Sequence, residues 1–396
     1  MNNDTKKGVF IGILLTVAAI MLFNTARIGY RTLIKDEINY TAKEKTIYDL
    51  MKENYVEDIS DEDIYEGLFI GMVALATDKY SRYISAEDYK SYEIDTQGNY
   101  AGIGTKTTVS PDDYSIYIIS TYEDSPARKA GIKPGDKIIK VNGTDVTYES
   151  YDDAINSIRG PEGTTVELTI KRDGTTFNTT VTREHVDVPT VGGALMDNNV
   201  GYIKIEGFEA VTYDQYKEVY NSLRDKGITS LIIDLRNNPG GLLDSVASIA
   251  DDIIPEGTIT YTEDKNGERE YIKSAEGEID IPLAVIVNEN SASAAELLTA
   301  AVKDTGKGII VGKTTYGKGV VQTTYPLTDG SAVKLTTSRY YTPKGVCIDK
   351  VGITPDIEVD APQDFEISSL SGNTAQYDLT NDTQLIKAYE YLINDQ

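Results

Sequence analysis

The sequence predicts a multidomain α/β protein with a helical N-terminal region. Over residues 187–360, apolar runs suited to buried strands alternate with segments of helical spacing, which is typical of α/β folds. Residues 28–95 show the helical spacing alone. A chain of 396 residues is long enough for two or three domains. We expect five regions, at residues 1–27, 28–95, 96–186, 187–360 and 361–396.

The N-terminal segment predicts a membrane anchor. An uncharged stretch, GVFIGILLTVAAIMLF, follows a polar tip of residues 1–7. It is shorter than the roughly 20 apolar residues of a usual span, but the next three residues can extend it into the interface. The alternative is a cleaved signal peptide, which wants small residues at the last and third-last positions; Ala26 fits and Asn24 does not. We favour an uncleaved signal anchor at residues 8–26, with a cytoplasmic tip. The protein would then be a single-pass protein of the cell membrane with the bulk of the chain outside the cytoplasm.

Composition excludes several classes of function. The formal net charge is -25, so nucleic acid is a poor partner on electrostatic grounds. Cys347 is the only cysteine, which excludes a disulfide within the chain and a cysteine-based zinc site. His185 is the only histidine. The lack of any His/Cys cluster agrees with a protein that uses neither a metal nor an organic cofactor.

The two ends of the chain beyond the anchor predict helices. Residues Ile38–Tyr55 and Asp61–Ala76 carry apolar side chains at helical spacing, and alone they indicate only a small helical module. Residues 361–381 lose periodicity and are rich in Ser, Gly, Asn and Asp, which indicates a linker. Residues Asp382–Ile393 predict a last amphipathic helix.

Residues 96–186 contain a second group of motifs. The apolar loop Gly102-Ile103-Gly104 precedes a predicted strand, the segment SPARKAGIKPGD follows, and residues Tyr151–Ile158 form an amphipathic pattern. Together they resemble a PDZ domain. PDZ domains bind a peptide C-terminus as an added strand, with backbone amides around its carboxylate.

The PDZ resemblance implies roles for two sets of residues. Gly102, Ile103 and Gly104 would be the carboxylate cradle, and Arg159, in the R-G-x-x-G turn after the helix, would relay peptide occupancy to the catalytic part. The alternative for the two glycines is that they merely permit a tight turn. The neighbouring SPARKAGIKPGD segment favours the cradle.

A glycine pair follows one predicted strand of the α/β region. The segment DLRNNPGGLL starts at Asp234 and leads from the strand into a helix that ends near Ile253. Gly240 and Gly241 allow backbone N–H groups to point inward at the helix start, a geometry that suits an oxyanion. The alternative is a plain strand-to-helix turn with glycines in the left-handed conformation.

A second strand–turn–helix unit carries a candidate nucleophile. The apolar run Leu283–Val287 is followed by the turn SASAAE and a helix to about Lys303. Ser293 and Glu296 match the S-x-x-E capping box, and this pattern alone favours a capping role. The alternative is that Ser293 is a nucleophile, since the helix N-terminus offers N–H groups to an oxyanion.

A nucleophilic serine needs a base, and the sequence offers a lysine. His185 lies in a polar segment, which argues against a Ser-His-Asp triad. Lys318 lies between two glycines and before two valines, a setting in which desolvation would populate the neutral amine. Gln322, four residues later, would share its face in a strand or a helix and hold the amine without adding charge. The alternative for Lys318 is a solvated surface lysine.

Together these motifs resemble those of the carboxyl-terminal processing peptidases, also called tail-specific proteases. The motifs S-A-S-A-x-E, Y-G-K-G-x-x-Q and D-x-R-x-N-P-G-G all occur, and the PDZ-like region extends the resemblance over nearly the whole chain. The resemblance implies a crotonase-like α/β serine protease core. It implies a catalytic dyad of Ser293 and Lys318, supported by Gln322.

The resemblance also implies an oxyanion hole made by the backbone of Gly240 and Gly241 with the N–H of Ala294. Substrates would be proteins or peptides with free C-terminal tails, cleaved through an acyl-enzyme, and terminal helices would build a homodimer. Two other classes of function are a catalytically silent, membrane-anchored PDZ scaffold and an acyl-CoA enzyme of the crotonase type. Retention of the serine, lysine, glutamine and glycine pair argues against the scaffold. The PDZ-like region and the membrane segment fit the acyl-CoA enzyme poorly.

Overall fold

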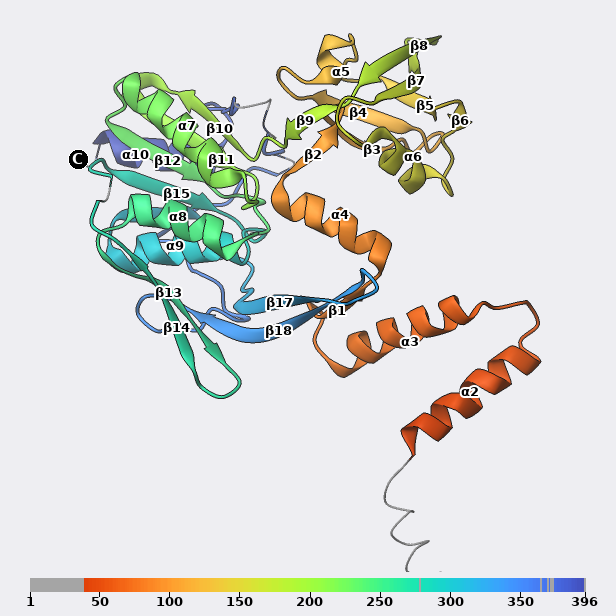
Figure 1. The fold of residues 1–396 in the computed structure, drawn as a ribbon. Helices are drawn as coiled ribbons and strands as arrows, with labels where there is room; N and C mark the ends of the chain where they lie inside the picture. Colours follow the sequence, from red (N-terminus) through yellow and green to blue (C-terminus); the bar gives the residue numbers. More distant parts are fainter. Residues whose placement is uncertain (1–38, 278, 364, 369, 371–373, 395–396) are drawn as a thin grey trace, which may run out of the picture. The chain divides into compact units, whose positions relative to one another are not determined.

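The computed structural model describes residues 39–394, apart from residues 278, 364, 369 and 371–373 (Figure 1). The predicted membrane anchor at residues 8–26 lies outside the described residues. Among the helices that are described, none combines the length and the apolar character needed to cross a membrane.

The chain divides into two compact units, and the first of them ends at Met72. It contains helix α2 (Tyr40–Asn54) and most of α3 (Asp61–Ala76), which confirms both helices predicted there. The side chain of Asn39 caps α2, because its Oδ1 accepts the N–H of Ala42 at 3.0 Å. Three acidic residues in the first turn of α3 complement the positive end of the helix dipole.

The second unit begins at Val73, and its PDZ-like part spans residues 99–187. A sheet of order β3-β4-β5-β7-β8 carries β6 on β5, and β2 pairs separately with β9. The predicted amphipathic helix is confirmed as α6, which packs its apolar face on a core of buried isoleucines, leucines and valines. The elements are β2 (Asn99–Gly102), β3 (Thr105–Val109), β4 (Ile116–Thr121), α5 (Pro126–Lys129), β5 (Lys137–Val141), β6 (Thr144–Asp145), α6 (Tyr151–Ile158), β7 (Thr165–Arg172), β8 (Thr175–Thr182) and β9 (Glu184–Asp187).

The rest of the second unit is built on a six-stranded sheet of order β10-β11-β12-β15-β16-β19. Strand β10 is antiparallel to β11, and the other neighbours are parallel. This confirms the predicted alternation of strands and helices. The elements are β10 (Val191–Leu195), β11 (Val200–Ile205), α7 (Thr212–Asp225), β12 (Ser230–Asp234), α8 (Leu243–Ile253), β15 (Leu283–Val287), α9 (Ala294–Thr305), β16 (Gly308–Gly312), β19 (Ile357–Glu358) and α10 (Thr383–Asn394).

Helices cover both faces of this sheet (Figure 1). Successive side chains of a strand point to opposite faces. Thus Leu231 and Ile233 of β12 pack with α7, α8 and α9, whereas Ile232 packs with Leu385 and Ala388 of α10. Because neither face meets water, the central strands are continuously apolar rather than alternating.

A smaller sheet holds the ribbon that follows the lysine motif. Its order is β1-β18-β13-β14, and β17 pairs with β18. Helix α4 (Ala86–Gln97) connects β1 to the PDZ-like part and starts at Ser85, whose hydroxyl accepts the N–H of Asp88. The strands are β1 (Arg82–Ile84), β13 (Gly257–Asp264), β14 (Arg269–Ser274), β17 (Val320–Pro326) and β18 (Ala332–Tyr341).

The sheet topology brings the glycine pair and the serine turn to one edge. Strands β12 and β15 are parallel neighbours, with Asp234 opposite Ile286. Their carboxyl ends therefore lie side by side, and so do the two loops that follow them. In open α/β sheets this edge is where ligands bind.

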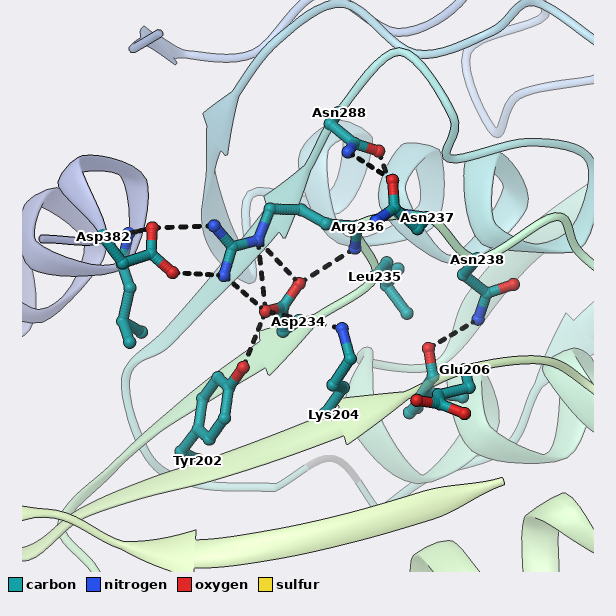
Figure 2. Close-up of polar contacts among 12 residues, drawn as sticks. Tyr202, Lys204, Glu206, Asp234, Leu235, Arg236, Asn237, Asn238, Asn288 and Asp382 are labelled. Atoms are coloured by element: carbon teal, nitrogen blue, oxygen red, sulfur yellow. Dashed lines mark hydrogen bonds and ion pairs between the residues drawn. The ribbon is translucent and has the colours of Figure 1, made fainter. Parts of the chain in front are cut away.

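Charged side chains are buried beneath these loops (Figure 2). The guanidinium of Arg236 lies between Asp234 and Asp382, with a nitrogen 2.7 Å from an oxygen of each. Burial disfavours the ionised form of Asp234, but the charges of Arg236 and Lys204 outweigh burial and hold its pKa well below the usual range. The hydroxyl of Tyr202 also donates to Asp234 at 2.7 Å. These contacts attach the start of α10 to the loop that follows β12.

We predict that Asp382→Ala destabilises the protein by about 3–5 kcal/mol, because it leaves the charge of Arg236 buried without one of its two partners. Urea unfolding followed by circular dichroism measures the loss. The matched control is Asp360→Ala, since Asp360 also forms an ion pair but its side chain is 86% exposed. The control should cost less than about 1 kcal/mol. Equal costs for the two variants would show that the buried pair adds nothing to stability.

Candidate active site

Ser293 occupies a strained turn between β15 and α9. Its backbone has φ 55° and ψ -116°, a conformation that residues with a side chain seldom adopt and that costs of order 1–3 kcal/mol. Such residues cluster at active sites. The other serine of the turn, Ser291, is fully buried, and its hydroxyl donates to the carbonyl of Leu235 at 2.8 Å and accepts the N–H of Asn288 at 2.9 Å. Ser291 thus has a structural role, and Ser293 is the serine that faces the cavity described below.

Glu296 connects the serine turn to the lysine loop. Its carboxylate is fully buried in the first turn of α9 and accepts four hydrogen bonds. The donors are the N–H groups of Ser293 (2.9 Å), Gly317 (2.7 Å) and Lys318 (2.8 Å) and the hydroxyl of Thr315 (2.5 Å). The glutamate half of the predicted capping box is therefore present, but the sequence did not reveal the link to residues 315–318. The one available signal was a charged residue among the small apolar residues of this helix.

The glycine pair lies beside the serine turn. Asparagines join the two loops, and Figure 2 shows the side chains of Asn237 and Asn288 in contact. The side chain of Asn288 accepts the N–H of Asn237 at 2.9 Å and donates to its side-chain oxygen at 2.8 Å. Asn238 accepts the N–H of Gly240 on its Oδ1 at 2.8 Å. Gly240 has φ 101°, and a Cβ there would lie 2.7 Å from the Cβ of Ser293. Only glycine allows this close approach of the two loops.

Lys318 lies in the loop before β17 rather than on a strand. Its Nζ is 4.9 Å from the ring centroid of Tyr80. Burial lowers the pKa of Lys318, and the nearby charge of Lys334 lowers it further. The alternative of an ordinary solvated lysine therefore does not describe it.

Gln322 does not share a strand face with Lys318, contrary to the sequence-based expectation. Lys318 precedes β17, and a β-bulge separates Val321 from Gln322, so the regular two-residue repeat does not run between the lysine and the glutamine. The amide nitrogen of Gln322 donates to the hydroxyl of Thr336 at 3.2 Å.

One cavity of about 520 Å³ nevertheless brings the predicted residues together. Ser293, Lys318, Gln322, Gly240 and Gly241 all line it. Ala294 follows Ser293 at the start of α9 and is buried. Other lining residues flank the predicted motifs: Pro239, Leu242, Leu243, Asp244, Val320 and Val321. No sequence pattern indicated the rest, which come from distant parts of the chain: Tyr92, Asp95, Thr96, Phe208, Glu209, Lys334 and Tyr340.

His185 does not take part in this cavity. It lies on β9, with its Nε2 3.1 Å from Asp187, and it lines a different pocket. Among the described residues there is also no cluster of three or more His, Cys, Asp or Glu side chains that could hold a metal ion.

The predicted carboxylate cradle lies between β2 and β3. Gly104 has φ 74°, which favours glycine, and Ile103 is buried, with its carbonyl accepting the N–H of Ala127 at 2.8 Å. Gly102 ends β2. Glycine at position 104 thus permits the tight turn between β2 and β3.

Arg159 follows α6 in the PDZ-like part, and its side chain contacts β2 and α4. Its guanidinium carbon is 5.2 Å from the ring centroid of Tyr100, and one of its nitrogens is 3.8 Å from Asp95. Asp95 also lines the cavity that contains Ser293. The sequence gave no indication of Tyr100 or Asp95, because both contacts join separate elements.

We predict that Gly240→Ala lowers stability and the reactivity of Ser293 more than Gly227→Ala does. Both glycines have positive φ, so both substitutions cost roughly 1 kcal/mol in backbone strain. A Cβ at Gly227 meets open space, whereas one at Gly240 meets the Cβ of Ser293. Urea unfolding and labelling by a serine-directed fluorophosphonate measure the two effects. Equal behaviour of the variants would mean that the two loops can separate freely.

We predict that Glu296→Gln reduces labelling of Ser293 and destabilises the protein by about 1–3 kcal/mol for each donor left without an acceptor. An amide has one acceptor oxygen and an NH2 group in place of two oxygens, so two of the four donors lose their acceptor and face another donor instead. The matched control is Glu289→Gln, which removes an exposed charge from the same connection between β15 and α9. If both variants have the labelling rate and the stability of the unmodified protein, Glu296 does not hold the serine turn in place.

Comparison with known proteins agrees with this architecture. The family model described as Peptidase family S41 matches residues 199–359, a PDZ domain model matches 117–172, and the model of the activating protease CtpB N-terminal domain matches 24–88. A solved structure of an S41 protease from Bacteroides fragilis NCTC 9343 superposes with a TM-score of 0.53 over 88% of this chain and 97% of its own. At 18% identity this likeness concerns the fold alone.

Curated relatives are similar over most of the chain. The carboxy-terminal processing protease CtpA of Bacillus subtilis (strain 168) is 36% identical over 351 residues, which cover 87% of this chain and 75% of the relative. A probable CtpA-like serine protease of Staphylococcus saprophyticus is 33% identical over 392 residues, covering 98% and 79%. The chain therefore belongs to peptidase family S41, as a PDZ-containing member of the C-terminal processing serine proteases.

Proposed function

We propose that this chain is a serine endopeptidase that recognises protein C-terminal tails through its PDZ domain and cleaves with a Ser293/Lys318 dyad. The observation that carries the proposal is the shared cavity. A serine in a strained turn, a half-buried lysine of lowered pKa and a glycine pair line the same space. Neither a binding scaffold nor an acyl-CoA enzyme needs this combination.

In the proposed reaction, the hydroxyl of Ser293 attacks the scissile carbonyl carbon and the neutral amine of Lys318 takes its proton. Lys318 then gives this proton to the leaving amine, and an acyl-enzyme ester remains on Ser293. Water attacks the ester with Lys318 again as base, which frees the acid product and the serine. Burial of Lys318 supports this role because it favours the neutral amine. The flexible lysine stem allows Nζ to move from the face of Tyr80 to the hydroxyl.

The oxyanion would be stabilised by backbone N–H groups at the start of α9 and in the glycine loop. The N–H of Gly240 already donates to Asn238, so we assign the glycine donor to Gly241. The N–H of Ala294 would be the second donor. Removing one such donor typically costs about 10²–10³ in rate. Gln322 would hold the amine of Lys318 when the latter turns toward the serine.

The PDZ domain would bind the free C-terminus of the substrate as an added strand, with its carboxylate at Gly102, Ile103 and Gly104. Arg159 would relay occupancy of the cradle to the cavity through Asp95. Such coupling would open the active site mainly when a substrate tail is bound.

We also propose that residues 8–26 anchor the protein in the cell membrane as a single span, with the catalytic part extracytoplasmic. The uncharged stretch in the sequence supports this placement. The same proposal includes the five expected regions, with a PDZ domain at 96–186 and a catalytic core at 187–360. It also includes a homodimer.

The test is cleavage of an unfolded reporter protein with an apolar C-terminus by the full chain in mild detergent. Ser293→Ala and Lys318→Ala should each fold and should each lose nearly all turnover, because nucleophile and base act as one unit. Ser248→Ala is the control, since this serine lies on α8 outside the cavity. Melting curves show whether each variant is folded.

Turnover by Ser293→Ala at the level of the unmodified enzyme would reduce Ser293 to a helix cap and end the proposal. An unmodified enzyme that binds tails but never cleaves would favour the scaffold. A rise in melting temperature with acyl-CoA would favour the crotonase-type enzyme.

A further inference from the structure

A second lysine lines the cavity that contains Ser293 and Lys318. Lys334 lies on β18, opposite Thr324 of β17, and two residues farther along Thr336 lies opposite Gln322. Paired residues and alternate residues of antiparallel strands share a face. Lys334 is therefore on the face of the ribbon that carries Gln322, and it belongs to the lining of the same cavity.

The charge of Lys334 is not neutralised by an ion pair with any described residue. Its Nζ lies 4.8 Å from the ring centroid of Tyr92, on α4. The hydroxyl of Tyr92 is 3.5 Å from that of Thr324. The aromatic face holds the ammonium in place through a cation–π contact without cancelling its charge. The field of Lys334 consequently extends into the cavity.

Lys318 meets charged and titratable groups from several elements. Tyr80 lies under its Nζ, and Tyr316 precedes it in the same loop, while Glu296 on α9 accepts its backbone N–H. The charge of Glu296 is already shared among four donors. The ammonium of Lys79 donates to the hydroxyl of Tyr316 at 2.8 Å, so Tyr316 is already paired with a cation other than Lys318.

The remaining acids of the cavity are Asp95, Glu209 and Asp244. Asp95 faces Arg159 at 3.8 Å, and burial raises the pKa of Glu209, which weakens its negative charge. Tyr92 and Arg82 also face each other, with the guanidinium carbon 5.8 Å from the ring. Asp244 lies exposed in the first turn of α8, where solvent and salt screen its charge. The three acids are thus paired with Arg159, weakened by burial or screened by solvent.

Two ammonium groups that share a cavity repel each other, so one of them loses its proton more easily. Burial is the main effect that lowers the pKa of Lys318, and the charge of Lys334 is the next, so Lys318 should be that one. Three other groups raise the pKa of Lys318 through their charge: Tyr316, Tyr92 and Glu296. A lysine activated by a neighbouring cation is a known way to obtain a neutral amine near neutral pH.

We propose that Lys334 is a positioning residue whose fixed positive charge keeps Lys318 neutral and ready to take the proton of Ser293. The inference rests on the proposed Ser293/Lys318 dyad and adds a third side chain to it. Lys334 does not touch the reacting atoms in this scheme; it acts through Lys318.

The experiment compares the full chain with Lys334→Met and Lys334→Arg over about pH 6 to about pH 10, with kcat/KM for the reporter as readout. Removing the like charge raises the pKa of Lys318, so the rise of kcat/KM with pH moves to higher pH in Lys334→Met. Near neutral pH this variant should be about three- to tenfold slower, since one pKa unit is tenfold in the neutral fraction. At the alkaline end of the pH range, kcat/KM of Lys334→Met should approach that of the unmodified enzyme. Lys334→Arg keeps the charge and should keep the profile.

Lys226→Met is the matched control, because it removes the same charge from an exposed position outside the cavity. A loss in Lys334→Met that is equal at every pH, or an increase in KM without a shift of the profile, would overturn the proposal. The first outcome would mean a packing role and the second a substrate-binding role.

A second readout does not depend on cleavage. Acylation of amines by a lysine-selective reagent, followed by peptide mass spectrometry, reports the neutral fraction of Lys318 as a function of pH. The pH at which acylation of Lys318 is half-maximal should rise in Lys334→Met and stay unchanged in Lys334→Arg and Lys226→Met. If the midpoint stays constant in Lys334→Met, the proposal is wrong. If the midpoint moves but Ser293→Ala still cleaves, the link between the lysines holds and the proposed dyad fails.

Discussion

One buried carboxylate holds the two halves of the candidate active site together. The same oxygen of Glu296 accepts the N–H of Ser293 at 2.9 Å and the N–H of Lys318 at 2.8 Å. The other oxygen accepts from Gly317 and Thr315. A buried carboxylate is stable only when such donors surround it, so the serine turn and the lysine loop cannot drift apart without exposing an unpaired charge. The geometry of the cavity follows from this constraint.

The glycine loop is held by a second set of buried polar contacts. Parallel pairing of β12 and β15 places this loop beside the serine turn, and the Asn237–Asn288 hydrogen bonds keep the two in contact. Below them, Arg236 joins the loop to Asp382 at the start of α10. The C-terminal helix thereby supports the loop that would bind an oxyanion, although it lies on the opposite face of the sheet from α9.

These polar networks also set the electrostatic character of the cavity. Glu296 brings a negative charge close to Lys318 and opposes a neutral amine, while burial and Lys334 favour it. Because four donors share the charge of Glu296, its anchoring role interferes less with the proposed base. In the proposed mechanism, the pair of lysines would provide the base that a serine peptidase without a nearby histidine requires.

Local sequence patterns were sufficient to predict the elements and most of the candidate residues. Strands buried on both faces are continuously apolar, so the strand at 283–287 was predicted with the bounds that the structure has. Ser293, Lys318 and the glycine pair lie in short motifs that keep their chemistry within a few residues. The shared face of Lys318 and Gln322 was predicted wrongly, because it assumed a regular strand where a loop and a bulge occur. The partners of Glu296, the pairing of Arg236 with Asp382 and the place of Lys334 in the cavity required the folded chain. Each depends on the order and register of strands distant in sequence, which a local pattern does not encode.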